Sequence, residues 1–205
     1  MRVAALFKDH RIFLFENDSS DGTAAILHAF TSLDPNRRRC TTRRFLTAKA
    51  PGRTRRLAYI RQCLQDQLIQ SGYRPSVVVV MDLDDIGASP SPERVENFIT
   101  QACAFRGWDA AFPMISYDLA AWRPWRPAPL HEIVARAHGR PTRVVSSFNG
   151  IGVYKGSVYR RGTYRAPGQR LFGRHSRAGP CEHVTFHTSI APYARLAMLT
   201  SCPYP

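Results

Sequence analysis

Four consecutive valines lead directly into a cluster of three carboxylates in the segment VVVVMDLDDIG, residues 77–87. A run of β-branched residues is typical of a strand covered on both faces, as in the middle of a mostly parallel α/β sheet. Asp82 and Asp84 follow at its carboxyl end, and residues two apart on an extended chain point the same way. The two carboxylates can therefore converge on one ligand. The alternative is an acidic turn in which Asp84 or Asp85 caps a helix.

This pair of carboxylates predicts a cation site. Two adjacent carboxylates repel each other unless a cation or a shared proton lies between them, and Mg²⁺ or Mn²⁺ suits an all-oxygen ligand set. In open α/β sheets, ligands bind in the crevice beyond the carboxyl ends of the strands. A divalent ion at this position suggests a diphosphate as the group that it binds.

The length and composition fit one globular domain. The chain has 205 residues, of which 44% are hydrophobic and 21% charged, so a single domain over residues 1–205 can bury a sizeable core. The sequence has no uninterrupted apolar stretch of about 18 residues, so it predicts no transmembrane helix. The apolar run within the opening segment MRVAALFKDH is too short for a signal peptide. We therefore expect a cytoplasmic protein, and five cysteines without CxxC pairing disfavour zinc sites and disulfides.

The net charge of +14 is the outlying property, and only three of the 29 basic residues are lysines. A field of this size favours anionic partners such as nucleotides, acidic membrane surfaces or nucleic acid. The arginines gather in two clusters, RRRCTTRR at residues 37–44 and RTRRLAYIR at residues 53–61. Outside them, solvated surface charge is the alternative interpretation.

Hydrophobic periodicity predicts alternating strands and helices. Residues 34–55, rich in Arg, Thr, Pro and Gly, are expected to form a mobile connection with one short strand at 44–46. Pro113 in WDAAFPMI indicates an edge strand or a bend. The remaining expected elements are strands at 12–15, 77–80, 108–115 and 144–154 and helices at 24–30, 54–69 and 92–104.

Five motifs occur in a fixed order: ENDSSDGT, an arginine-bearing helix, VVVVMDLDD, FNGIGVYK and CEHVTFH. Together, over residues 11–187, they resemble the GT-A type glycosyltransferases, close to the family-2-like and fungal-capsule mannosyltransferase-like groups. The resemblance implies an α/β fold: a single GT-A (Rossmann-like) domain whose mostly parallel central sheet is flanked by helices. In the family a nucleotide-binding strand precedes the ENDSSDGT strand, and we expect it to be missing from this chain.

The resemblance implies a metal-dependent glycosyltransferase. Such an enzyme moves a sugar from a UDP-, GDP- or dTDP-sugar to a hydroxyl of a glycan, lipid or protein, with Mn²⁺ or Mg²⁺ as cofactor. Asp82 and Asp84 match the metal motif. A late histidine often completes the metal site in this fold, with His187 as the first candidate and His183 as the second, because their spacing alone cannot decide between them.

The resemblance also implies positions for the nucleotide and for a catalytic base. Glu16, Asn17 and Asp18 match the turn that holds base and ribose, with a simple Asx turn as the alternative.

Arg61, followed by Gln62, matches the family's Arg-Asn element, and Arg56 lies on the same helix. Glu182 is the candidate base for an inverting transfer. Asp109 and Asp118 compete with it, and an ion pair with an arginine is the other interpretation of Glu182.

Two other functions compete with this one. A haloacid-dehalogenase-like phosphatase also places two acids after an apolar strand, but it needs a later lysine and a later acidic pair, and only Lys155 follows. A non-catalytic Arg-rich domain that binds anions or RNA would use the arginine clusters. It leaves the acid cluster unexplained, so nucleic acid is not the expected partner, while peripheral contact with an anionic membrane is compatible with the charge.

Overall fold

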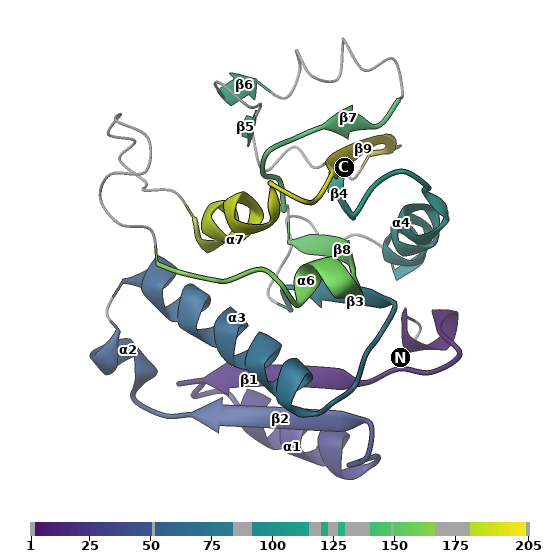
Figure 1. Cartoon of the computed structure of the whole chain (residues 1–205). Coiled ribbons are helices and arrows are strands. Elements are labelled where there is room, and N and C mark those ends of the chain that lie inside the picture. Colours follow the sequence, from purple (N-terminus) through teal and green to yellow (C-terminus); the bar gives the residue numbers. More distant parts are fainter. Residues whose placement is uncertain are drawn as a thin grey trace. The chain divides into compact units, whose positions relative to one another are not determined.

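The computed structural model describes residues 3–50, 52–83, 92–114, 120–122, 127–129, 140–148, 150–166 and 181–203. The chain divides into two compact units, which we describe separately (Figure 1). Residues 8–74 and 163–185 form one, here called the β1–β2 unit. Residues 1–7, 75–162 and 186–205 form the other, here called the five-stranded unit. The expectation of a single domain stays a prediction.

The β1–β2 unit is built on one parallel strand pair. β1 (Ile12–Asn17) and β2 (Arg38–Arg43) lie in register from Ile12 opposite Arg38 to Asn17 opposite Arg43, and α1 (Thr23–Ser32) connects them. β1 and α1 are the predicted strand–helix step, and the parallel partner β2 completes a strand–helix–strand unit that was not predicted at these residues. After β2 come the short α2 (Leu46–Lys49) and the long α3 (Arg53–Gln70), which packs against β1.

The five-stranded unit contains a mixed sheet with the strand order β3-β8-β4-β9-β7. Only the β4–β9 pair in this sheet is parallel; β3–β8, β8–β4 and β7–β9 are antiparallel. The prediction of a mostly parallel central sheet is therefore wrong, because β8 runs between β3 and β4 in the opposite direction to both. The strands are β3 (Val77–Met81), β4 (Ala110–Met114), β7 (Thr142–Arg143), β8 (Ile151–Lys155) and β9 (Leu196–Pro203).

Helices and a separate strand pair complete this unit. α4 contacts η1, β4, β8 and β9, and α6 follows β8 directly. β5 and β6 pair antiparallel in a sheet of their own. Their bounds are η1 (Val3–Leu6), α4 (Pro92–Ala104), β5 (Ala120–Trp122), β6 (Pro127–Pro129), α6 (Gly156–Tyr159) and α7 (Glu182–Ile190), of which residues 186–190 belong to this unit.

Apolar side chains from α4 and the sheet form the core of the five-stranded unit. Phe98 and Ile99 of α4 are fully buried against Ala111 of β4 and against Ile151 and Val153 of β8. Burying side chains of this size contributes about 1.5–3 kcal/mol each, so this cluster stabilises the packing of α4 on the sheet.

The sequence predicted several elements correctly. The valine run forms a strand, β3, Pro92 begins α4 as predicted, and the helix expected at residues 54–69 is α3. β3 is not covered on both faces in the middle of a sheet as expected, because its four valines are half-buried and it stands at one end of the strand order. The expected strand at 12–15 and helix at 24–30 correspond to β1 and α1.

One local prediction is wrong, and of the two alternatives left open for Pro113 the edge strand is excluded. Residues 38–43 form β2 and Leu46 begins α2, where a mobile connection with a strand at 44–46 was expected. β4 is not an edge strand, because it pairs with both β8 and β9; Pro113 instead lies beside a shift in the β4–β9 register, which fits the expected bend.

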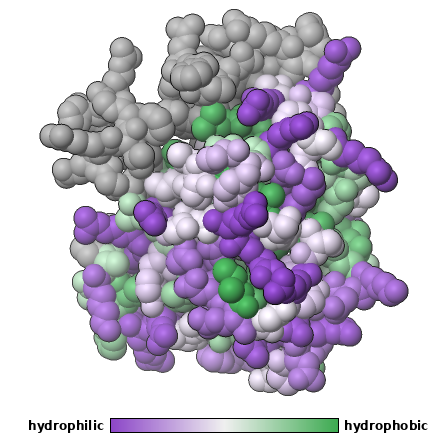
Figure 2. All heavy atoms as spheres, in the orientation of Figure 1, coloured by the Kyte–Doolittle hydropathy of each residue, from purple (hydrophilic) through white to green (hydrophobic). Residues whose placement is uncertain are grey.

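Some large apolar side chains of the described residues are exposed. Figure 2 shows a mostly hydrophilic face with small apolar spots. Ile26, Leu33 and Phe45 are 69%, 78% and 72% exposed, and scattered residues of this kind are ordinary on a protein surface. None of the described helices is long and apolar enough to cross a lipid bilayer.

Gly156, at the start of α6, has a neighbour that cannot move away. Its N–H donates to the Ser76 carbonyl oxygen at 2.8 Å, and an added Cβ would overlap the backbone carbonyl of Pro75. We expect Gly156→Ala to destabilise the five-stranded unit by about 1–3 kcal/mol, the usual cost of overpacking. Urea denaturation measures this, with the exposed Ser157→Ala as the control; equal stability of the two variants would contradict the packing argument.

Candidate functional site

The end of β3 lies beside the start of β8. Val80 is opposite Gly152 and Met81 is opposite Ile151. One residue further on, the N–H of Asp82 donates to the carbonyl oxygen of Gly150 at 2.9 Å. The half-buried Asp82 therefore follows the valine strand as predicted, next to the glycine segment of the FNGIGVYK motif. Asp84, the second predicted metal ligand, lies outside the described residues.

His187 lies in the core of the five-stranded unit. The ring is fully buried, and its Nδ1 and Nε2 lie 2.8 Å from Ser146 Oγ and 2.9 Å from Tyr154 Oη. The ring of Phe112 packs against it, with centroids 4.8 Å apart. A metal would have to replace one of the two hydroxyls. The assignment of His187 as a ligand stays a prediction, and no group of three His, Cys, Asp or Glu suited to a metal occurs among the described residues.

In the β1–β2 unit, two predicted site residues form a buried ion pair. Arg61 Nε on α3 donates to Glu182 Oε1, at the start of α7, at 3.0 Å. The two residues are 7% and 3% exposed, and His183 Nε2 lies 3.6 Å from the same carboxylate oxygen. The structure thus contains the ion pair that the sequence left open as the alternative for Glu182. Its role as a catalytic base stays a prediction.

Two further residues lie next to this ion pair: Gln62, which the sequence named only as the second member of the Arg-Asn element, and Tyr164, which it did not assign. Gln62, adjacent to Arg61, accepts the backbone N–H of Tyr164 at 2.9 Å. The Tyr164 ring contacts the His183 ring edge-on, with centroids 5.7 Å apart. The sequence offered one signal for Gln62: it stands where the family's Arg-Asn element has Asn, so a side-chain amide is present at that position in both.

Two carboxylates, one at the end of β1 and one directly after it, accept hydrogen bonds from backbone N–H groups. Glu16, which is 5% exposed, accepts the N–H of Ser19 at 2.8 Å. Asp18 has a φ of 58° and accepts the N–H groups of Phe45 at 2.6 Å and Thr47 at 2.8 Å, at the start of α2. Hydrogen bonds from the backbone and side chain of Thr47, followed by the Phe45 N–H, lower the pKa of Asp18 below 3.8. Glu16 and Asp18 thus have structural contacts, but not the Asx turn named as the alternative, because Asp18 binds N–H groups far along the chain; their contacts with a nucleotide stay predictions.

Arg56 and Asn17 are the other two residues that the resemblance assigned to the nucleotide. Arg56 Nη1 donates to the Ala50 carbonyl oxygen at 3.0 Å, which ties α3 to the chain that precedes it. Asn17 is half-buried at the end of β1. Their predicted contacts with a nucleotide stay predictions.

Of the two other candidates for the catalytic base, the structure describes only Asp109. Asp118 lies outside the described residues. Asp109 accepts hydrogen bonds from Lys155 Nζ and from the Arg195 backbone N–H, both at 2.8 Å. Burial raises the pKa of Asp109 most strongly, but these bonds and the two positive charges together outweigh it and lower the pKa below 3.8. Asp109 is thus held as a carboxylate within an ion pair.

Comparisons with known proteins identify no family for this chain. No family model, curated protein or solved structure matches it.

The buried ion pair makes a stability prediction. Removing one partner of a buried pair leaves an uncompensated charge, which costs about 3–5 kcal/mol. We expect Arg61→Met to lower the free energy of unfolding by this amount, and the double variant Arg61→Met, Glu182→Leu to recover much of it. Urea denaturation measures both. Arg55→Met, an exposed arginine on the same helix, is the control, and an equal loss in this control would contradict the prediction.

The lowered pKa of Asp18 makes a pH prediction. A carboxyl whose folded pKa is below its unfolded value of 3.8 stabilises the protein above that value, and the contribution is lost as the pH falls through the folded pKa. Asp18→Asn should therefore lower the melting temperature at pH 6 more than at pH 3. Melting curves of both proteins across this range test it, and a difference independent of pH would contradict it.

Proposed function

We propose that this chain is a metal-dependent glycosyltransferase that moves a sugar from a nucleoside-diphosphate sugar to a hydroxyl acceptor. The observation that carries the proposal is the pairing of β3 with β8. It brings together two motifs that were linked beforehand only through their order in the sequence, the acidic end of the valine strand and the FNGIGVYK segment. Asp82 and Gly150 are joined by a backbone hydrogen bond of 2.9 Å.

The two residues contribute different chemistry to this proposal. Asp82 is half-buried at the carboxyl end of a strand and offers oxygen to a hard cation. Gly150 has a φ of 78°, a conformation in which glycine is favoured and in which the absence of a side chain lets a ligand approach the backbone closely. A carboxylate beside a half-buried glycine is a suitable arrangement for a metal-bound diphosphate and its sugar.

In this proposal, Asp82 and Asp84 hold Mn²⁺ or Mg²⁺. When bound, the ion supplies a positive charge that stabilises the departing diphosphate. The residues of the β1–β2 unit that the resemblance assigns to the nucleotide, namely Glu16, Asn17, Asp18, Arg56 and Arg61, remain part of the proposal on that basis alone. We assign no catalytic base, since the carboxylate of Glu182 is buried against Arg61.

A thermal-shift panel tests the proposal. UDP-, GDP- and dTDP-sugars are added with Mn²⁺ or with EDTA, and a ligand at 100 times its Kd should stabilise the folded protein by about 2.7 kcal/mol. We expect at least one sugar nucleotide to raise the melting temperature in Mn²⁺ and to lose most of this effect in EDTA.

Variants of the acid motif locate the effect. Asp84→Ala and Asp82→Asn should abolish the Mn²⁺-dependent shift, while Glu93→Gln, an acid-to-amide change on the exposed first turn of α4, should retain it. If no sugar nucleotide stabilises the native protein, or if the acid-motif variants respond like the native chain, the proposed function is wrong.

A further inference from the structure

β2 has one edge without a strand beside it. The sheet of the β1–β2 unit contains two strands, so among the described residues β2 pairs with β1 alone. An unpaired edge presents a row of backbone N–H and C=O groups that can pair with another extended chain. Five of the six residues of β2 line a hollow of about 470 Å³ in this unit.

The register shows which backbone groups face this open edge. Ile12 is opposite Arg38, and its N–H donates to the Arg37 carbonyl oxygen at 2.7 Å. In a parallel ladder, alternate residues of a strand bond to the same neighbour, so Arg39 and every second residue after it face β1. The backbone groups of Cys40 and Thr42 therefore face away from β1, toward the open edge.

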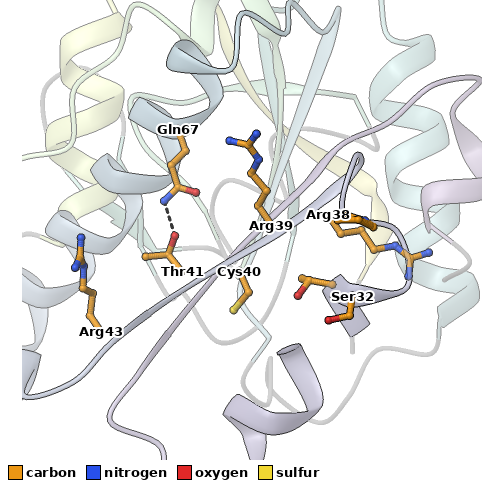
Figure 3. A pocket seen from close by; sticks show the side chains of 9 residues that line it. Ser32, Arg38, Arg39, Cys40, Thr41, Arg43 and Gln67 are labelled. Carbon is orange, nitrogen blue, oxygen red and sulfur yellow. Dashed lines mark hydrogen bonds between the residues drawn. The ribbon is translucent and has the colours of Figure 1, made fainter. Parts of the chain in front are cut away.

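The hollow continues from one face of β2 to the other. On one face it is lined by Arg39, Thr41 and Arg43, with Gln67 of α3, whose side chain donates to Thr41 Oγ1 at 2.8 Å. Figure 3 shows Arg39 and Gln67 on one side of the strand and Cys40 and Ser32 on the other. Arg38, Thr31 and Pro35 complete the lining on the α1 side. The hollow is open to solvent and has lining residues on both faces of β2.

The charge of this hollow is positive. Arg38 is half-buried and fixed, since its guanidinium lies 4.4 Å from the centre of the Phe30 ring and donates to the Phe30 carbonyl oxygen at 3.1 Å. Arg39 and Arg43 are exposed on the other face. No carboxylate lines the hollow, and within the described residues none forms an ion pair with Arg39 or Arg43.

We propose that the β2 edge binds an acidic polypeptide segment in extended conformation, which adds to the sheet as a third strand. Backbone groups at Cys40 and Thr42 would pair with the main chain of the segment. Alternate carboxylates of the segment would lie on the face of Arg39 and Arg43, which are separated by about 13 Å along the strand at 3.3 Å per residue. Strand addition takes affinity from the main chain and specificity from alternate side chains.

Charge complementarity favours this occupant over a second copy of the chain. Pairing β2 with β2 would set arginine against arginine, and like charges directly opposite each other destabilise a strand pair. The phosphates of a nucleic acid could pair with the arginines, but a nucleic acid has no peptide backbone to pair with the alternating N–H and C=O groups of the strand edge. The hollow also lacks an aromatic side chain on which a base could stack.

The test measures binding of a labelled seven-residue peptide with the sequence EVEVEVE by fluorescence anisotropy. We expect saturable binding that is absent for KVKVKVK and lost when alternate amides of the acidic peptide are N-methylated. The double variant Arg39→Glu, Arg43→Glu should weaken binding by about tenfold or more, since two charge pairs are reversed. Arg94→Glu, an exposed arginine on α4 in the five-stranded unit, should bind as the native chain does.

Several results would overturn the proposal. They are no binding of EVEVEVE, equal binding of the N-methylated peptide, or binding of oligouridylate but not peptide through Arg39 and Arg43. Self-association of the native chain that the double variant abolishes would assign the edge to a second copy instead. Arg39→Ser, Arg43→Ser provides a milder variant, and circular dichroism confirms that each variant is folded. The outcome is independent of the sugar-nucleotide panel, because no residue is shared between the two tests.

Discussion

The antiparallel pairing of β8 determines most of the contacts described for the five-stranded unit. This one strand bonds to β3 on one side and to β4 on the other. It sets the end of the valine strand beside Gly150, and it carries Tyr154, whose hydroxyl lies 2.9 Å from His187 Nε2. Its last residue, Lys155, forms the ion pair with Asp109. A slip of β8 by one residue would turn each of these side chains to the other face of the sheet.

The β1–β2 unit has a different kind of interior. It buries charged and polar side chains, and the pair Arg61 and Glu182 joins positions that are 121 residues apart in the sequence. Such a pair adds little net stability compared with apolar side chains of the same volume, but it is costly to break on one side. The pair therefore favours one packing partner for Arg61 of α3, namely Glu182, and both residues belong to the same unit. Among its described residues, the buried polar ones are Glu16, Arg61, Gln65, Glu182 and His183.

Local patterns of the sequence predicted the elements better than their arrangement. The valine run and the apolar periodicity of α3 identify a strand and a helix, because these patterns reflect local backbone preference and hold although the four valines are only half-buried. The direction of β8 could not be predicted, because a short apolar strand looks the same in a parallel and an antiparallel sheet. β2 was missed because Arg and Thr side chains suit an exposed edge as well as a loop, and propensity rules describe buried strands best.

The candidate site was predicted in part for the same reasons. Asp82 follows its strand as expected, since its backbone N–H continues the pairing of β3 with the chain before β8. His187 was found as a buried residue whose neighbours, Ser146 and Tyr154, come from other parts of the sequence and give no signal beforehand.

The order of the strands in the five-stranded sheet has a consequence for synthesis. β3 pairs with β8, which begins at Ile151, and β4 lies between β8 and β9, which begins at Leu196. Contacts of such long range slow folding, because the intervening chain must close before they form. On a ribosome, the four valines of β3 emerge well before any strand that pairs with them in this sheet. This apolar segment would be exposed during that interval and open to non-native association, so the yield of folded chain should depend on the rate of elongation.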